Sequence, residues 1–404
     1  MITKGMDFTM ISEKMIKLTE SNSVIRAMFE EGNRLAALHG RDNVYDFSLG
    51  NPNIPSPSAV NNAIVDIVNN EDPVALHGYM SNVGYPAVRE AIAKSLNTRF
   101  NTSFNETNII MSCGAAGGLN VVLKTLVNPG DEIIVVSPFF VEYGNYVSNF
   151  DGELVILPAT RFDFQPDPET LRLAITPKTK AVIINSPNNP TGVIYTEETI
   201  KQLAAVLEEK AEEFGSPIYI ISDEPYRELA YDGVEVPFLT KYYKNTLICY
   251  SWSKSLSLPG QRIGYIVVPS EVDDYDLIFD AAGIATRILG YVNAPALIQR
   301  VVAKCLYEQT NIGIYDTNRM VLYKGLKKLG FEPLYPQGAF YLWLKTPDED
   351  KEFVQKAKKY NLLLVPGSAF TCPGYARIAY CVETEKIKNS LHAFKKLAKE
   401  YGLK

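Results

Sequence analysis

AVIINSPNNPTGVIYTEETIKQLAAVLEEKAEEFGSPIYIISDEPY, residues 181–226, is the stretch that decides the fold. It contains AVIINS (181–186) and IYIIS (218–222), two continuously apolar runs of the length of strands. Strands of this kind lie in parallel sheets whose two faces are both covered by helices. Between them, residues 197–214 repeat apolar side chains at helical spacing, and Gly215 ends the pattern. A strand, a helix and a strand in this order predict an α/β sheet.

The same alternation extends on both sides of this unit. Further apolar runs of strand length are NIIMS (108–112), EIIVVS (132–137), LICYS (247–251) and IGYIVV (263–268). A helical pattern at 119–127 stops at the Asn-Pro-Gly of 128–130. Only the short turn LPGQR precedes IGYIVV, so we expect this strand to run antiparallel. Together these runs predict a three-layer α/β/α large domain with a mostly parallel sheet.

The last hundred residues have a different pattern. Lysine-rich helical stretches at 302–329, 350–360 and 384–402 surround two short strands, FYLWLK (340–345) and ARIAYC (376–381). They predict a smaller α+β domain. We therefore expect an N-terminal segment (residues 1–60) that packs with the small domain, a large domain (61–295) and a small C-terminal domain (296–404).

Composition excludes several classes of protein. Of the 404 residues, 46% are apolar and 21% are charged, which is typical of soluble globular proteins. The net charge of −6 argues against a nucleic-acid partner. No run of eighteen apolar residues is present to span a membrane, and MITKGMDFTMISEK at the N-terminus lacks a signal-peptide core. Five scattered cysteines without a CxxC pair fit a reducing cytoplasm, and three distant histidines indicate no metal site.

Small or aromatic residues follow two of the predicted strands, where open α/β sheets bind their ligands. CGAAGG follows NIIMS and begins a helix, so the backbone N–H groups of Gly114, Ala115 and Ala116 are candidates for a phosphate cup. The alternative is a tight strand–helix turn. Phe140, after EIIVVS, is a candidate to stack on a planar ring, although a lone aromatic residue is more often part of the core.

Polar residues follow three more of the predicted strands. Asn189 lies in a proline-rich turn, where asparagine is favoured in any case. Asp223 ends an apolar strand, where a buried carboxylate needs a cation, and Tyr226 comes three residues later. SWSKSLSLPGQR places Lys254 among serines and ahead of Arg262; taken alone, such a lysine is a solvated loop cation.

One ligand would use all of these groups, namely a phosphorylated pyridine aldehyde. A lysine forms an imine with its aldehyde, and an acid pairs with its ring nitrogen and keeps the ring an electron sink. A phenol and an amide bind the ring hydroxyl, and an arginine holds the phosphate as a two-pronged donor.

With these motifs, the chain resembles the class I/II, fold-type I aminotransferases that use pyridoxal 5′-phosphate. The matching motifs, in the family's order, are LGNP (49–52), NPTG (189–192), SDEPY (222–226), SxSKSxSxPGxRIGY (251–265), QGAFYLW (337–343) and GYARIAY (374–380). The resemblance covers nearly the whole chain. It implies transfer of an amino group between an L-amino acid and a 2-oxo acid through a pyridoxamine phosphate intermediate.

The resemblance also implies a role for each residue. Lys254 forms the imine and then moves a proton between Cα of the substrate and C4′ of the cofactor. Asp223 keeps the ring nitrogen protonated. Asn189 and Tyr226 bind the ring oxygen, and Phe140 stacks on the ring. Gly114, Ala115, Ala116, Ser251 and Arg262 bind the phosphate, and Arg377, Gly50 and Asn189 bind the substrate carboxylate. Tyr79, in HGYMSNVGYP, reaches the phosphate in the neighbouring subunit, which implies a homodimer with shared active sites.

Two departures from the family pattern leave alternatives open. CGAAGG lacks the Ser, Thr, Lys or Gln side chain that relatives often carry in this turn. Arg287, in ATRILGYVNAP (285–295), could reach the distal carboxylate of a substrate from the other subunit, or could be a surface arginine. The motifs do not fix which bond at Cα breaks, so a carbon–sulfur β-lyase is the alternative activity. A non-enzymatic cofactor-binding regulator is a further alternative, which the acidic charge disfavours.

Overall fold

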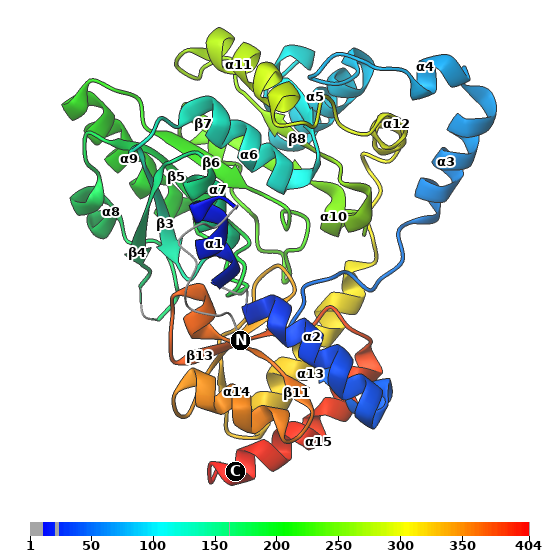
Figure 1. Cartoon of the computed structure of the whole chain (residues 1–404), viewed down its shortest axis with the longest axis vertical. Helices are drawn as coiled ribbons and strands as arrows, with labels where there is room; N and C mark the ends of the chain where they lie inside the picture. The colour runs from blue at the N-terminus through cyan, green and yellow to red at the C-terminus, as the bar shows by residue number, and fades with distance from the viewer. Residues whose placement is uncertain (1–10, 21–23, 161, 404) are drawn as a thin grey trace.

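The computed structural model describes residues 11–20, 24–160 and 162–403, and its largest element is a seven-stranded sheet (Figure 1). In sheet order the strands are β2 (Ile109–Ser112), β8 (Gly264–Val267), β7 (Thr246–Ser251), β6 (Tyr219–Asp223), β5 (Thr179–Asn185), β3 (Glu132–Ser137) and β4 (Glu153–Pro158). Neighbours are parallel except that β8 is antiparallel to both β2 and β7. The predicted sheet and the antiparallel direction of residues 263–268 are therefore confirmed.

The sequence did not single out β4. It lies at the edge of the sheet and pairs with β3 alone, so Glu153, Ile156 and Pro158 are exposed and only Leu157 is fully buried. Its sequence, ELVILP, does contain an apolar run at 154–157, so this strand was overlooked although its pattern resembles that of the inner strands.

Helices cover both faces of the large sheet, which explains the continuously apolar strands. Ile133 and Val135 of β3 pack on one face with residues of α6 and α11, whereas Ile134 packs on the other face with residues of α8 and α9. The helices around this sheet are α3 (Ser58–Asn70), α4 (Pro73–His77), α5 (Pro86–Phe100), α6 (Gly114–Leu126), α7 (Glu142–Asn149), α8 (Pro168–Ala174), α9 (Glu197–Phe214), α10 (Trp252–Ser255), α11 (Tyr275–Ile288) and α12 (Ala296–Lys304).

The predicted helix 197–214 is confirmed with its end at Gly215. Gly215 adopts φ 64°, a left-handed conformation that glycine adopts readily, and its N–H closes the last turn. Short 3₁₀ helices lie between the α-helices and strands, at Arg41–Asn43, Glu106–Asn108, Leu239–Lys241, Pro259–Gln261 and Gly367–Phe370.

The C-terminal part of the chain builds a second, smaller sheet, drawn at the bottom of Figure 1. Its antiparallel strands, in order, are β12 (Val365–Pro366), β13 (Tyr375–Ala379), β10 (Tyr341–Lys345) and β9 (Glu332–Pro333). It is accompanied by α13 (Ile312–Lys328), α14 (Asp350–Lys358) and α15 (Thr384–Glu400). The predicted smaller α+β unit is therefore present.

One predicted helix is corrected. The expected helical stretch 302–329 is interrupted between α12 and α13, and Thr310 in the connection donates its backbone N–H to the Ser255 carbonyl at 2.8 Å. Asn311 is the N-cap residue of α13, and α12 and α13 pack in different cores. Val301 and Val302 pack beside the large sheet, whereas Tyr315 and Leu322 pack in the core of the small one.

The N-terminal segment meets the C-terminal part. β1 (Tyr45–Asp46) pairs in parallel with β11 (Leu362–Leu363), and the rings of Phe47 and Phe394 lie 6.3 Å apart. Farther upstream lie α1 (Glu13–Glu20) and α2 (Val24–His39). The division into residues 1–60, 61–295 and 296–404 stays a prediction, and α12 belongs by its packing with the large sheet.

Membrane-spanning helices and metal-binding clusters are both lacking among the described residues. None of the helices in the described ranges is long and apolar enough to cross a membrane. The same residues contain no group of three or more His, Cys, Asp or Glu side chains that could hold a metal ion.

Candidate active site

A pocket of about 290 Å³ lies at the carboxyl ends of β5, β6 and β7 and reaches the small sheet. Its lining includes most of the predicted site residues: Gly50, Ala115, Ala116, Phe140, Asn189, Asp223, Tyr226, Ser251, Lys254, Arg262 and Arg377. They are far apart in sequence, and parallel strands bring their ends to one edge of the sheet. The convergence of these ends, inferred from sequence, is thus observed.

Lys254 enters the pocket from α10, directly after β7. Its Nζ donates to the Gly50 carbonyl at 2.9 Å and lies 5.2 Å from the centre of the Phe340 ring. Burial lowers the pKa of Lys254 to about 8, because removal from water disfavours the charged ammonium. A lysine in this state supplies a neutral amine near neutral pH much more readily than a solvated lysine does.

Asp223 ends β6 and is buried. Its Oδ2 accepts a hydrogen bond from the Tyr143 hydroxyl at 2.5 Å, and its Oδ1 is buried with no hydrogen-bond partner among the described residues. Burial raises the pKa of this carboxyl to about 7. A buried acceptor without a donor is costly, so Oδ1 has the character of a ligand-binding atom.

Arg377, on β13, is the buried cation at the opposite end of the pocket. Its guanidinium donates to the Ser48 carbonyl at 2.5 Å and to Oδ1 of Asn189 at 3.0 Å, while its Nε is buried without a partner. The Tyr341 and Phe370 rings lie 4.7 and 4.8 Å from the guanidinium carbon. Protein acceptors use only part of the five-donor guanidinium, so the rest can bind a carboxylate.

Tyr226 and Tyr341 form a pair of phenols in the pocket, with 2.9 Å between their hydroxyl oxygens. Tyr341 also explains why residue 50 is glycine. A Cβ on Gly50 would lie 1.9 Å from the Tyr341 hydroxyl oxygen, so no side chain fits there. The sequence prediction named Gly50 and Tyr226 but missed Tyr341, although it lies in the quoted QGAFYLW motif.

The end of the pocket toward α6 suits an anion. Gly114 begins α6 with φ 75°, and Arg262 lies so close that a Cβ on Gly114 would come within 2.9 Å of its Nη2. Arg262 also donates to the Cys113 carbonyl at 3.2 Å and to the Pro259 carbonyl at 2.9 Å. The free N–H groups of the first helical turn and a guanidinium at this end are a favourable pair for a phosphate.

Hydroxyl groups add to this anion end. The hydroxyl oxygens of Ser251 and Ser253 lie 2.6 Å apart, and both residues line the pocket. Sequence analysis named Ser251 and missed Ser253, which carried no signal apart from its place beside Lys254. It also missed Asn185, the last residue of β5 and part of the predicted strand 181–186, whose amide donates to the Asp223 carbonyl at 2.9 Å.

Three predicted residues do not line this pocket. Tyr79 is 93% exposed, and Arg287 lies exposed near the end of α11. Gly114 is not part of the lining either. It lies beside the guanidinium of Arg262, and Arg262 does line the pocket.

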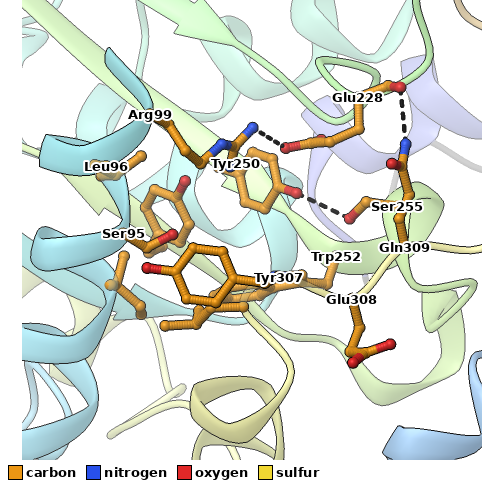
Figure 2. A pocket seen from close by; sticks show the side chains of 13 residues that line it. Ser95, Leu96, Arg99, Glu228, Tyr250, Trp252, Ser255, Tyr307, Glu308 and Gln309 are labelled. Carbon is orange, nitrogen blue, oxygen red and sulfur yellow. Dashed lines mark hydrogen bonds and ion pairs between the residues drawn. The ribbon is translucent and has the colours of Figure 1, made fainter. Parts of the chain in front are cut away.

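A second pocket, of about 250 Å³, lies between α5 and the connection that follows α12 (Figure 2). Its polar groups are bound mainly to one another: Arg99 pairs with Glu228 at 2.9 Å, and Tyr250 with Ser255 at 2.8 Å. It contains none of the predicted site residues. The pocket around Lys254 is therefore the candidate active site.

The comparisons with known proteins agree with this geometry. The family model for aminotransferase class I and II matches residues 42–394. The aspartate/prephenate aminotransferase of Thermus thermophilus is 31% identical over 329 residues, which cover 78% of this chain and 82% of that protein. A solved amino transferase from Eubacterium rectale has 48% sequence identity and a TM-score of 0.95, covering 98% of this chain and all of that one. The Thermus thermophilus aspartate aminotransferase solved with maleate has 26% identity and a TM-score of 0.84, covering 96% and 100%.

An α/β fold with this site and these relatives defines a pyridoxal 5′-phosphate-dependent enzyme of fold type I. The chain belongs to the class I and II aminotransferase family. It is an aminotransferase that moves an amino group between an amino acid and a 2-oxo acid, and no finding favours the β-lyase alternative.

Proposed function

We propose that the pocket around Lys254 is the transamination site and that its residues take the roles expected from the sequence. Lys254 holds the cofactor, Asp223 faces its ring nitrogen, and Arg377 binds the substrate's α-carboxylate. The remaining assignments are Asn189 and Tyr226 at the ring oxygen, Phe140 against the ring, Gly50 and Asn189 at the carboxylate, and Gly114, Ala115, Ala116, Ser251 and Arg262 at the phosphate.

The observation that carries the proposal is the distribution of charge in one pocket. A buried amine whose pKa is near 8, an unpartnered buried carboxylate oxygen and two guanidinium groups line the same cavity. These groups fit the cofactor, which has an aldehyde for the amine, a ring nitrogen for the acid and a phosphate for one guanidinium. When bound, the cofactor supplies an electron sink for the electrons released at the substrate's Cα.

The residues of the chain then divide the work. Arg377 orients the substrate through its carboxylate, so that the Cα–H bond lies within reach of Lys254. The Lys254 amine takes the proton from Cα and returns it on the cofactor side, as a general base and then a general acid. Asp223, held ionised, stabilises a protonated ring nitrogen. Tyr341 and Phe370 flank Arg377 and shield it from water.

We also propose that the site is shared between two copies of the chain, with Tyr79 reaching the partner's phosphate. Asn82 donates to the Val292 carbonyl at 2.6 Å, so the Tyr79 loop lies beside the segment that follows α11. Exposed apolar side chains occur on three of the helices of this part of the chain, α3, α4 and α11: Val65, Val68, Val74, Leu277, Ile284 and Ile288. Figure 1 shows these helices along the upper and right margin of the large sheet. Exposed apolar side chains favour an interface, and a two-fold one would complete both sites reciprocally.

We propose only the general class of the amino donor and the cellular compartment of the enzyme. Three cations line the pocket among the described residues, namely Lys254, Arg262 and Arg377, and each already has a role. For a donor with a second carboxylate, the candidate cation is therefore Arg287 of the partner subunit, and the alternative is that Arg287 is a surface arginine. The five cysteines are free, which fits a cytoplasmic enzyme of amino-acid biosynthesis.

The test is a two-step reaction with a panel of L-amino acids. A transaminase converts each accepted donor to its 2-oxo acid only once per bound cofactor, until a 2-oxo acid acceptor is added. A β-lyase would instead release pyruvate and ammonia continuously from cysteine-type substrates without any acceptor. Continuous release without an acceptor would contradict the proposed use of this site.

A further inference from the structure

The proposed roles leave one buried phenol beside Asp223 unexplained, that of Tyr143 on α7. Its side chain is almost fully buried beside β6, and its hydroxyl donates to Oδ2 of Asp223 at 2.5 Å. The other oxygen of that carboxylate, Oδ1, has no partner among the described residues. The bond therefore engages Oδ2 and leaves Oδ1 as the carboxylate oxygen without a partner in the described part of the chain.

Packing alone does not explain a tyrosine at this position. The Tyr143 ring stacks on Phe139, with ring centres 6.3 Å apart, and meets the edge of Phe140 at 5.6 Å. A phenylalanine would make the same ring contacts without burying a hydroxyl. A buried hydroxyl is costly unless it forms a hydrogen bond, and Asp223 supplies that bond.

The other ionisable groups near Asp223 do not replace Tyr143. Glu224 forms a buried salt bridge with Arg227, and its negative charge raises the pKa of Asp223. The remaining neighbours are Tyr146 on α7, Tyr226 after β6 and Cys249 on β7, and no hydrogen bond joins any of them to the carboxylate among the described residues. Tyr143 is thus the side-chain donor that favours the ionised form of Asp223.

We propose that Tyr143 is a positioning residue that keeps Asp223 ionised and turns its Oδ1 toward the ring nitrogen of the cofactor. A hydrogen bond to the charged form of an acid stabilises that form, so the proton is left on the partner of Oδ1. The phenol also fixes the rotation of the carboxyl group, because only one oxygen can face Tyr143. The inference rests on the proposed role of Asp223 and adds a residue that the sequence did not indicate.

The test replaces Tyr143 by phenylalanine and follows Asp223 in the cofactor-free protein. The carboxyl group is observed by carbon-13 NMR with labelled aspartate, and Asp223→Ala identifies its signal. A lost charge-assisted bond should make Asp223 in Tyr143→Phe hold its proton about ten- to a hundredfold more tightly. Tyr146→Phe is the matched control, since it removes a phenol one turn along the same helix and should leave the titration unchanged. A wild-type titration in Tyr143→Phe overturns the proposal, whatever the cofactor does.

A second measurement uses the loaded protein. The nitrogen-15 shift of a labelled cofactor distinguishes a protonated from a neutral ring nitrogen, and Tyr143→Phe should move it toward the neutral value. Replacing Tyr143 by 3-fluorotyrosine, a more acidic phenol of nearly the same shape, should move both readouts the opposite way, which tests the idea even if Tyr143→Phe folds poorly. If Asp223 responds but the ring nitrogen does not, the assignment of Asp223 to the ring is wrong. If neither responds, Tyr143 has only a packing role.

Discussion

Replacing Arg377 by leucine should weaken the use of every amino donor alike. In the structure this guanidinium donates one hydrogen bond to the Ser48 carbonyl and one to Oδ1 of Asn189, and its buried Nε has no partner among the described residues. A substrate carboxylate would therefore take two of the remaining donors. Each charge-assisted bond is worth roughly 1.5–3 kcal/mol. Losing both should cost about 3–5 kcal/mol, since such terms do not add fully, which is on the order of a hundred- to several-thousandfold in kcat/KM.

The assay compares kcat/KM for acidic, aromatic and aliphatic donors in the wild type and in Arg377→Leu. Two controls isolate the carboxylate. Arg377→Lys keeps the positive charge but not the paired donors of the guanidinium, so its kcat/KM should lie between those of Arg377→Leu and the wild type. Conversion of an amine that lacks the α-carboxylate should be nearly as fast in Arg377→Leu as in the wild type. A loss confined to dicarboxylic donors would refute the reasoning, because Arg377 would then read the side chain.

Three further predictions concern the rest of the site. Asp223→Ala should slow proton removal at Cα far more than donor binding in single-turnover traces, and equal slowing of both steps would count against its role. Because burial lowers the pKa of Lys254 to about 8, competitive acetylation of this amine in the cofactor-free protein should rise with pH with a midpoint near 8 and level off only above that value. A midpoint near the ordinary lysine value would show that the amine is not desolvated. Mixing inactive Lys254→Ala with a damaging Tyr79→Ala variant should restore activity to roughly one quarter of wild type, since each mixed dimer gains one intact site. Flat activity after demonstrated subunit exchange would rule out the shared site, provided that Tyr79→Ala is inactive alone.

The sequence predicted the parts of the fold that leave a local pattern. The inner strands were predictable because burial on both faces makes them continuously apolar, whereas the edge strand β4 was overlooked although it carries a similar run, LVIL at 154–157. The break between α12 and α13 was missed although Asn311, a favoured helix-capping residue type, and Gly313 mark it in the sequence; what no local pattern shows is that the two helices pack in different cores.

The same distinction applies to the site. Asp223 and Lys254 were predictable because charged residues at the ends of apolar strands conflict with their surroundings. Tyr143 was not, because an aromatic residue in a core-forming helix agrees with its surroundings, and only its contact with Asp223 reveals a use for the hydroxyl. Tyr341 was missed for a related reason: its meaning lies in its closeness to Gly50, nearly three hundred residues away in the chain.

The most direct test of the central claim is to find the lysine that carries the cofactor. The protein is loaded with pyridoxal 5′-phosphate, reduced with borohydride and digested, and the modified peptide is identified by mass spectrometry. We predict one modified residue, Lys254, and no stable adduct in Lys254→Ala. A label on another lysine, or an adduct that persists in Lys254→Ala, would contradict the assignment of this pocket.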